Sequence, residues 1–348
     1  MEKVLLISCA GYDNFGDEAM FKEIYKDLKS RGKSITVAYY SFDLKKTKER
    51  HPNVNFIKLK DLPRRLGSIR KPFMDITSQI YAAQYDALYI TGAGNLTSLY
   101  TKHIENIYFL VSAFKKKNKY IEFRPQSVGP FFGSKKSIDE SYVKEIVKIA
   151  DKFYVRDYIS YEYIKETSEN VKLSNDEAWD LEIIKPKEFN PSILENKKLV
   201  GVSIRPFRTE KEYLIKWFKA LVDELNSKGY TPFFIPICYN EQSPEYQDNY
   251  FLKTIIGEKG IFLEDLIDIN SLEPENIKYF VNMCQKCIGL SYHFNVFSLS
   301  LGKRVISLYY EDYYKVKNLG LQKAFGNTEN VVNPLKVKVK EVIDLLEK

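Results

Sequence analysis

The sequence has few of the residues from which covalent or metal-bound frameworks are built. Its 348 residues include four cysteines, three histidines and two tryptophans. Cys284 and Cys287 have CxxC spacing, but no second pair of ligands accompanies them, and a structural zinc site takes four. We therefore expect reduced, buried thiols beside a strand, and neither a metal site nor a cofactor.

The sequence also lacks a long apolar run, and its first residues do not predict a signal peptide. A membrane-spanning helix needs about 18 apolar residues, and no stretch approaches that length. Residues 1–9 form a short apolar run with an acid near its head, which predicts a first strand, because a secretory signal would begin with basic residues. We expect a cytoplasmic protein.

Charge of one sign does not dominate the sequence. The net charge of +7 is modest for this length and suits anionic small substrates or an anionic membrane surface. Peripheral contact with the inner face of the membrane is therefore among the expected interactions. No stripe of alternating aromatic and basic residues argues for nucleic acid, and the sequence carries no signal for an oligomeric state.

Apolar segments alternate between strand-like and helix-like patterns, which is typical of parallel sheets with crossover helices. The composition, 44% hydrophobic and 28% charged, is that of a globular protein. The predicted strands are 4–8, 34–40, 87–91, 120–123, 152–155, 199–204, 232–237, 261–263, 287–290 and 305–308. The predicted helices are 17–31, 106–117, 138–150, 210–228 and 337–347, and 61–84 fits neither class well.

A proline-containing break divides the pattern. Residues 184–191 carry two prolines and little apolar periodicity, and the alternation restarts at Leu199. We predict an α/β fold of two Rossmann-like domains, residues 1–183 and 198–348, joined by a linker over 184–197. Two such domains facing across a cleft would bring loops from both to one ligand site.

The first strand–helix junction, residues 9–18, contains two glycines in a tight loop. It lacks the G-x-G-x-x-G spacing of a dinucleotide site, and acids at the helix start would repel a phosphate there. Asp17 is suited to cap the helix. The loop favours a hydroxyl-bearing ligand, with a capped turn that binds nothing as the alternative.

Further along, polar residues follow several predicted strands. Gly92, Gly94 and Asn95 come after one strand, where glycines let a ligand approach the backbone. Arg124, Arg156 and Arg205 each stand at or beyond a strand's carboxyl end, and three arginines on one rim would suit phosphate and carboxylate groups. For any one of them a structural salt bridge is an equal alternative.

His293 follows the predicted strand 287–290 and begins a predicted helix. Ligands of open α/β sheets bind at the carboxyl ends of strands, so this imidazole is a candidate acid–base group or anion contact. His51 and His103 stand in polar segments and are predicted to lie at the surface.

Taken in order, these motifs resemble those of the polysaccharide pyruvyl transferase family. The resemblance runs over nearly the whole chain, through Gly11–Glu18, Gly92–Asn95, Gln126–Pro130, Arg156–Ser160, Asp176–Ala178, Arg205, Tyr292-His293, Gly302 and Tyr310. It implies a GT-B-like fold of two Rossmann-like domains. It also implies transfer of the enolpyruvyl group of phosphoenolpyruvate to two sugar hydroxyls, as a cyclic ketal, with release of phosphate.

The resemblance assigns roles to individual residues. His293 is the implied catalytic acid, and Asp17 and Asn14 would bind or activate the acceptor. The C-terminal domain would be the donor side, and the donor would be bound by residues from both domains: Arg156, Arg205, Arg124, Lys315 and Ser291. The acceptor loops of the N-terminal domain would include Gly11, Asn14, Gly16, Glu18, Gly92, Gly94, Asn95 and Gln126. The partners are phosphoenolpyruvate, as a substrate, and a sugar or lipid-linked glycan.

Two departures from the family pattern concern the donor site. Ser291 stands where members commonly have arginine, and Arg304 stands where they commonly have proline. The spacing from Tyr310 to Lys315 is also longer than usual. Arg304 or Lys315 would then supply the missing positive charge, or the donor would differ.

Two other classes of function fit the same architecture. A nucleotide-sugar glycosyltransferase would use an acid such as Glu311 or Asp312 to contact ribose hydroxyls. A non-catalytic sugar-binding protein of polysaccharide assembly would bind its ligand without turnover.

Overall fold

The computed structural model describes residues 1–11, 13–39, 44–60, 69–206, 210–239 and 246–348. The chain divides into two compact units. Unit 1 comprises Met1–Tyr12 and Met20–Glu177, and unit 2 comprises Asp13–Ala19 and Ala178–Lys348. The segment predicted as a linker, 184–197, lies within unit 2, where Phe189 and Leu194 are buried.

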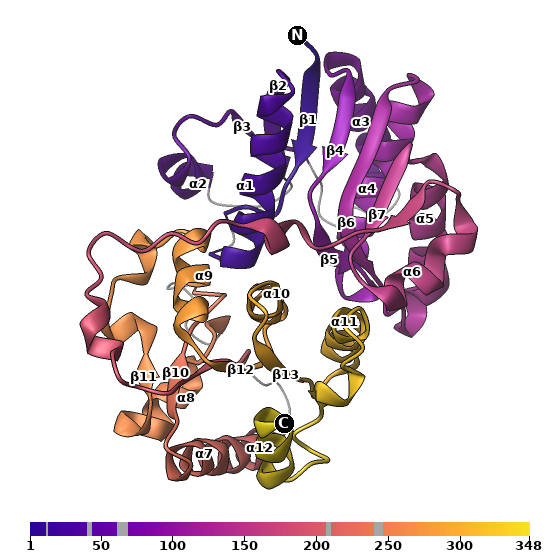
Figure 1. Cartoon of the computed structure of the whole chain (residues 1–348). Coiled ribbons are helices and arrows are strands. Elements are labelled where there is room, and N and C mark those ends of the chain that lie inside the picture. Colours follow the sequence, from indigo (N-terminus) through magenta and orange to yellow (C-terminus); the bar gives the residue numbers. More distant parts are fainter. Residues whose placement is uncertain (12, 40–43, 61–68, 207–209, 240–245) are drawn as a thin grey trace. The chain divides into compact units, whose positions relative to one another are not determined.

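Unit 1 is built on a parallel sheet with the strand order β3-β2-β1-β4-β6-β7-β8, and β5 pairs with β6 (Figure 1). Its strands are β1 (Lys3–Ile7), β2 (Ser34–Tyr39), β3 (Phe56–Lys58), β4 (Ala87–Ile90), β5 (Ala93–Leu96), β6 (Tyr120–Val128), β7 (Lys152–Val155) and β8 (Val171–Leu173). Its helices are α1 (Phe15–Ser30), α2 (Leu44–Arg50), α3 (Arg70–Gln84), α4 (Thr101–Lys116), α5 (Lys136–Ile149) and α6 (Tyr158–Ile164). The division between the units passes through α1.

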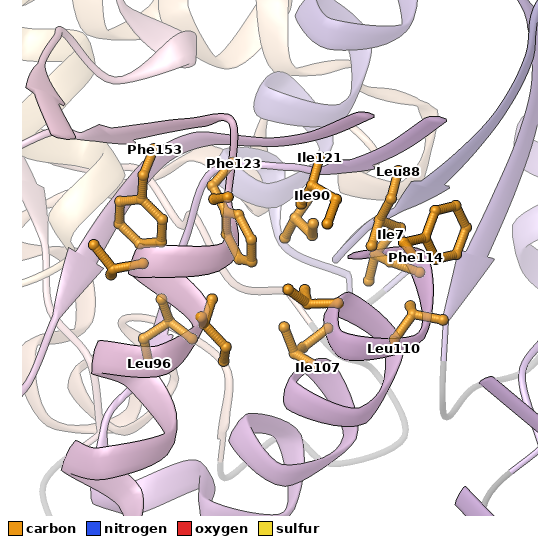
Figure 2. Packing of buried hydrophobic residues seen from close by; sticks show 14 of the residues in the cluster. Ile7, Leu88, Ile90, Leu96, Ile107, Leu110, Phe114, Ile121, Phe123 and Phe153 are labelled. Atoms are coloured by element: carbon orange, nitrogen blue, oxygen red, sulfur yellow. The ribbon is translucent and has the colours of Figure 1, made fainter. Parts of the chain in front are cut away.

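Helices cover both faces of this sheet, which is why its central strands are apolar on both sides. Ile7, Ile90 and Phe123 pack against Ile107 and Phe114 of α4 on one face (Figure 2). On the other face the alternate residues of β1 and β4 pack against α1 through Phe21, Ile24 and Leu28.

Unit 2 repeats the design with the strand order β11-β10-β9-β12-β13-β14, again all parallel. Its strands are β9 (Leu199–Ser203), β10 (Thr231–Phe234), β11 (Ile261–Phe262), β12 (Lys286–Gly289), β13 (Arg304–Leu308) and β14 (Val331–Val332). Its helices are α7 (Lys211–Ser227), α8 (Tyr250–Ile256), α9 (Pro274–Met283), α10 (Tyr292–Ser300), α11 (Asp312–Lys323) and α12 (Val339–Glu347). Helices α7, α8 and α12 share one apolar core with the sheet, while Phe294 of α10 approaches Gly201 of β9.

Two parallel sheets with crossover helices confirm the predicted α/β fold of two Rossmann-like domains. The unplaced segment 61–84 contains α3, and 61–68 lie outside the described residues. Strand β6 continues to Val128, with a register shift between Phe123 and Gln126. Arg124 and Gln126 therefore lie within a strand, and not beyond its end as predicted.

The prediction of surface positions for His51 and His103 is only partly confirmed, because both residues are half-buried. The His51 ring packs at 5.1 Å from that of Phe21 and 5.9 Å from that of Phe56. His103 is half-buried in the first turn of α4, where burial lowers its pKa to about 4. The predicted helix started at residue 106 and so left His103 outside it, because the apolar face of α4 begins only at Ile104.

Candidate active site

His293 lies in the first turn of α10, directly after β12 ends at Gly289. It is therefore at the carboxyl edge of the unit 2 sheet, where the sequence predicted it and where ligands of such sheets bind. The residue is 7% exposed, and its ring meets that of Tyr292 edge-on, with 5.3 Å between the ring centroids. This burial gives the imidazole a fixed position at the edge of the sheet.

The first turn of α1 packs against this histidine, although it lies near the start of the sequence. The Phe15 amide donates to the Ile237 carbonyl at 2.9 Å, and the Tyr239 amide donates to the Asp13 carbonyl at 2.9 Å. Phe15 and Tyr239 stack with ring centroids 4.2 Å apart. Residues 13–19 are thus built into unit 2, beside the segment that follows β10.

Gly16 makes the closest approach to the imidazole. A Cβ atom added at Gly16 would lie 2.0 Å from His293 Nδ1 and 2.1 Å from its Cγ. No side chain fits in that space, so the glycine at this position is required by contact with His293. The sequence identified both residues as site residues but held no signal that they touch.

The cap of α1 differs from the prediction. Asn14 Oδ1 accepts from the amides of Gly16 at 2.9 Å and Asp17 at 3.3 Å, so Asn14 caps the helix and Asp17 does not. Asp17 lies in the first turn, half-buried, beside the buried Glu18. Gly11 belongs to unit 1, where the Thr47 side chain leaves no room for a Cβ atom at this position.

A buried carboxylate, Asp248, connects several predicted site residues of unit 2. Its Oδ1 accepts from Arg205 Nη1 at 3.0 Å. Its Oδ2 accepts from the Ser291 hydroxyl and from the amides of Ile237 and Cys238 at 3.1 and 3.2 Å. Asp248 is 1% exposed, and its charge raises the pKa of Arg205 well above the usual value although burial alone would lower it. The sequence did not point to Asp248, because no motif surrounds it.

A second lysine of α11, Lys317, lies beside this region. The predicted Lys315 is exposed on α11, with its ammonium group 6.0 Å from the ring centroid of Tyr309. Lys317 is buried, with its ammonium group 4.9 Å from the ring centroid of Tyr292 and 4.7 Å from that of Tyr313. Lys317 shares the inner face of α11 with Asn318 and Leu321, so the helical period was the signal that could have found it.

Buried amides fix α10 and α11 on the sheet. Asn295 Nδ2 donates to the Gly289 carbonyl at 3.1 Å and to Asn318 Oδ1 at 3.2 Å. Asn318 Nδ2 in turn donates to the Leu308 carbonyl at 2.8 Å. His293 lies two residues before Asn295 and Lys317 lies next to Asn318, so the amide bonds hold both helices in register with the strands.

Arg304, one of the two departures from the family pattern, does not supply charge at this edge. It begins β13, at the amino end of the strand, and so lies at the opposite edge of the sheet from His293. Its Nε donates to the Leu345 carbonyl at 3.0 Å and its Nη2 to Asn330 at 3.3 Å. The residue attaches the end of α12 to the sheet.

In unit 1 the two predicted arginines are paired with neighbouring acids. Arg124 Nε donates to Glu177 at 2.8 Å, and Arg156 Nη1 donates to Asp176 at 2.7 Å. The Arg156 side chain is completely buried, whereas that of Arg124 is 21% exposed. For these two residues the geometry favours the salt-bridge alternative.

The remaining unit 1 candidates surround the same acids. The Gly92 amide donates to Glu177 Oε2 at 3.0 Å, and a Cβ at Gly92 would lie 2.9 Å from the Pro125 carbonyl oxygen. Gln126 Nε2 donates to the Thr91 carbonyl at 2.7 Å. Gly94 and Asn95 lie in β5, and Asn95 Nδ2 approaches Cys9 Sγ at 3.7 Å.

Burial raises the pKa of Glu177 to about 7, against the opposing charge of Arg124. Between pH 4.5 and 7 the folded protein keeps a proton that the unfolded chain has released, so stability should fall as pH rises through this window and level off above it. Wild type should lose on the order of 3 kcal/mol in free energy of unfolding across this window, and Glu177→Gln should not show this loss. Urea unfolding at pH 4.5, 6 and 7.5 measures it, with Glu145→Gln on the exposed face of α5 as control. Parallel pH curves for wild type and Glu177→Gln would contradict the shift.

The CxxC thiols behave as predicted. Cys284 and Cys287 do not form a disulfide. Both are buried, Cys284 just before β12 and Cys287 within it.

Within the described ranges, no group of three or more His, Cys, Asp or Glu side chains is arranged to hold a metal ion. No helix in the described part of the chain is long and apolar enough to cross a bilayer.

Comparison with known proteins gives one family and one fold. The family model described as polysaccharide pyruvyl transferase matches residues 14–313. A search of the curated proteins finds no match.

Among solved structures, the UDP-GlcNAc 2-epimerase from Methanocaldococcus jannaschii has a TM-score of 0.61 at 11% identity, covering 100% of this chain and 92% of that chain. The calicheamicin glycosyltransferase CalG4 has a TM-score of 0.56 at 8% identity, covering 99% and 90%. Anabaena Alr3699/HepE in complex with UDP-glucose has a TM-score of 0.54 at 12% identity, covering 100% and 98%. At these identities the likeness concerns the fold, which is GT-B-like.

Proposed function

The chain belongs to the polysaccharide pyruvyl transferase family, and on that premise we propose that it transfers the enolpyruvyl group of phosphoenolpyruvate to a sugar. The product is a cyclic ketal on two sugar hydroxyls, and phosphate is released. The observation that carries the proposal is the buried His293 at the carboxyl edge of the unit 2 sheet, with Gly16 pressed against its ring. An imidazole held in this way is suited to proton transfer at one fixed place.

Phosphoenolpyruvate carries a phosphate and a carboxylate, so its pocket needs cations. In unit 2 the candidates are Arg205, whose side chain is 26% exposed, and Lys317 beside Tyr292. Arg205 pairs with one acid, Asp248. Arg124 is shared by three acids and the Arg156 side chain is completely buried, so these two arginines are assigned structural roles. Lys315 is a weaker candidate than Lys317, because it is exposed on α11 whereas Lys317 is buried.

We assign to Ser291 an indirect role in donor binding, through its hydrogen bond to Asp248. Its hydroxyl donates to one oxygen of Asp248, and the other oxygen accepts from Arg205. Ser291 therefore positions the carboxylate that orients Arg205, in place of a direct contact with the donor. This arrangement keeps a cation at the edge of the sheet although the arginine common in the family is missing.

The reaction has two additions at the same carbon of the donor. In the first, a sugar hydroxyl bonds to C2 of the enolpyruvyl group while C3 takes a proton, which we assign to His293. The C2–O bond to phosphate then breaks, phosphate leaves with the electron pair, and a second hydroxyl bonds to C2. Two protons are released from the sugar hydroxyls. One restores the proton that His293 gave to C3, and the other is taken up by the released phosphate.

We assign activation of the acceptor hydroxyls to Asp17. Asn14 was the other candidate, but its Oδ1 accepts two backbone amides as the cap of α1. Asp17 lies one residue from Gly16, in the same turn that touches His293. A carboxylate there is placed to accept a proton from a hydroxyl near the histidine.

The proposal is tested by phosphate release from phosphoenolpyruvate in the presence of a panel of free and lipid-linked sugars. We expect release that depends on both the donor and one class of acceptor, and protection of the protein against thermal unfolding by phosphoenolpyruvate alone. No release with any acceptor together with no protection by phosphoenolpyruvate would overturn it.

A nucleotide-sugar glycosyltransferase is the second candidate, favoured by the fold it shares with a glycosyltransferase and with a protein bound to UDP-glucose. Its ribose contact would come from Glu311, which precedes α11, or from Asp312 in its first turn. Thermal protection by UDP but not by phosphoenolpyruvate would favour it. Sugar binding without turnover of either donor would instead indicate a non-catalytic binding protein.

A further inference from the structure

We propose that α3 carries a docking surface for an anionic lipid bilayer. The surface, called here the isoleucine face, consists of the exposed residues Ile69, Pro72, Ile76, Ile80 and Ala83. The three isoleucines are 66%, 60% and 51% exposed. Single exposed apolar residues are common on protein surfaces, whereas a contiguous group of them marks an interaction site. Docking requires neither donor nor acceptor, so the inference is independent of the proposed function.

The helical period joins these five residues into one strip. They are three or four positions apart along the helix, and residues at such spacings are neighbours on a helix surface. Ile69 comes directly before α3 but has helical backbone angles, φ −76° and ψ −24°, so it continues the row. The strip therefore runs along the whole of α3, a length of about 20 Å.

The opposite side of α3, which packs on the rest of unit 1, is the more polar one. Its buried residues are Arg70, Met74, Thr77, Ser78 and Ala82. Arg70 donates to Glu105 and Asn106 of α4. The Thr77 hydroxyl donates to the Phe73 carbonyl at 3.0 Å. A helix at a protein surface normally turns its apolar side to the core and its polar side to water. The reversed arrangement of α3 indicates that its outer side has a partner that is not water.

Charge is absent from most of the isoleucine face. Residues 76–85, all of which the structure describes, contain no Asp, Glu, Lys or Arg. The charged residues of α3 are Arg70, Lys71 and Asp75, near its start, and the Asp75 carboxylate lies 3.3 Å from Lys116 of α4. The outer side of the helix can therefore enter the boundary between lipid headgroups and acyl chains without burying a charge over most of its length.

Positive charge predominates around the isoleucine face. The Lys60 amide donates to the Tyr81 hydroxyl of α3 at 3.3 Å, and α4 packs beside α3 through Arg70. Residues 60, 69–86 and 101–119 contain eight basic residues and three acids. The basic residues are Lys60, Arg70, Lys71, Lys102, Lys115, Lys116, Lys117 and Lys119, and the acids are Asp75, Asp86 and Glu105.

The acids do not cancel this excess. Asp75 pairs with Lys116 at 3.3 Å, Asp86 with Lys119 at 3.4 Å, and Glu105 with Arg70. Asp151 is a fourth acid at the border of the group, 3.9 Å from Lys115. With Asp151 included, the group has a net charge of +4. Lysines and arginines close to a membrane are attracted to anionic headgroups, so the charge and the apolar strip favour the same partner.

A second copy of this chain fits the surface less well. It would present the same excess of positive charge. One helix is also a small surface compared with the roughly 800 Å² per partner that stable protein interfaces bury. A bilayer needs no matching shape, and it combines an apolar interior with negative headgroups.

Flotation of the whole protein with lipid vesicles tests the proposal. Vesicles of phosphatidylcholine alone are compared with vesicles that contain about one-third phosphatidylglycerol. We expect binding to the anionic vesicles to be stronger by about tenfold or more at low salt. The preference should diminish as the ionic strength rises, because salt screens the attraction between the lysines and the headgroups.

Variants of the whole protein locate the docking surface. Ile76→Ser/Ile80→Ser should weaken binding to the anionic vesicles by about tenfold or more, because the apolar contact with the bilayer is reduced. Lys71→Gln/Lys117→Gln should also weaken it by about tenfold, and should leave any binding to neutral vesicles unchanged.

The matched control is Ile183→Ser/Ile184→Ser, which changes isoleucines of unit 2 that are 45% and 47% exposed. This control should bind like wild type. Circular dichroism verifies that each variant is folded.

The proposal is overturned if wild type binds anionic vesicles no better than neutral ones, or if Ile76→Ser/Ile80→Ser binds like wild type. An equal loss of binding in the Ile183→Ser/Ile184→Ser control would also overturn it, because the attachment would not be specific to α3. Analytical ultracentrifugation examines the alternative partner. A dimer that Ile76→Ser/Ile80→Ser dissociates, without vesicle binding by wild type, would assign the isoleucine face to a second copy of the chain.

Discussion

Replacing His293 with alanine is expected to lower the rate of phosphate release from phosphoenolpyruvate by about 10²–10⁴-fold, the usual contribution of a general acid. The imidazole is the group that we assign to protonation of C3, and it is fixed in the first turn of α10 at the carboxyl edge of the sheet. Thermal protection by phosphoenolpyruvate should persist in the variant, because Arg205 and Lys317 are unchanged.

A second substitution separates the proton from the packing. His293→Gln keeps a side chain of similar size against Gly16 but cannot act as an acid near neutral pH, so it should be as inactive as His293→Ala. His103→Gln, which changes a histidine of unit 1, should retain the wild-type rate. A His293→Gln enzyme with near wild-type kcat would refute the role in proton transfer, even if His293→Ala were inactive.

Gly16→Ala is expected to lower the free energy of unfolding by about 1–3 kcal/mol, the usual penalty for a methyl group forced into filled space. The added Cβ would lie 2.0 Å from His293 Nδ1, so either the loop or the imidazole must move. Displacement of a catalytic group by about 1 Å is expected to reduce the rate by roughly 10²-fold. Urea unfolding and steady-state phosphate release measure the two effects.

A double-mutant cycle identifies the clash. In the His293→Ala background the ring is absent but the Cβ of residue 293 remains, 2.5 Å from the added atom, so Gly16→Ala should lose only part of its effect on stability. The difference between the two penalties is the coupling between Gly16 and His293. An equal penalty in both backgrounds would mean that the helix start, and not the imidazole, resists the methyl group.

Much of the architecture was predictable because buried parallel strands are continuous apolar runs. Residues 4–7 are such a run, and the structure places β1 there with these residues fully buried. Short strands were missed, among them β3 and β8 with three residues each, because so few residues show no period. Strand β5 was missed because Gly94 and Asn95 are typical of loops.

The candidate site was predictable where one residue carries a signal by itself. His293 is a rare titratable group after a strand, and the sequence located it correctly in the fold. Asp248 was missed because its importance comes from the groups that donate to it, which are far away in sequence. Likewise, the arginines were predicted as ligand contacts because their acidic partners, Asp176 and Glu177, are brought to them only by the fold.

The insertion of residues 13–19 into unit 2 has a consequence for biosynthesis. This segment is made well before its partners at 237–239 and His293. At about 5–20 residues per second, the interval is on the order of ten seconds or more. Until then the segment has nothing to pack against, so a nascent chain that has completed most of unit 1 still presents Phe15 to solvent. This edge of unit 2 can be completed only after residues 237–239 have been made, and a chain truncated before residue 237 would keep that phenylalanine exposed to chaperones.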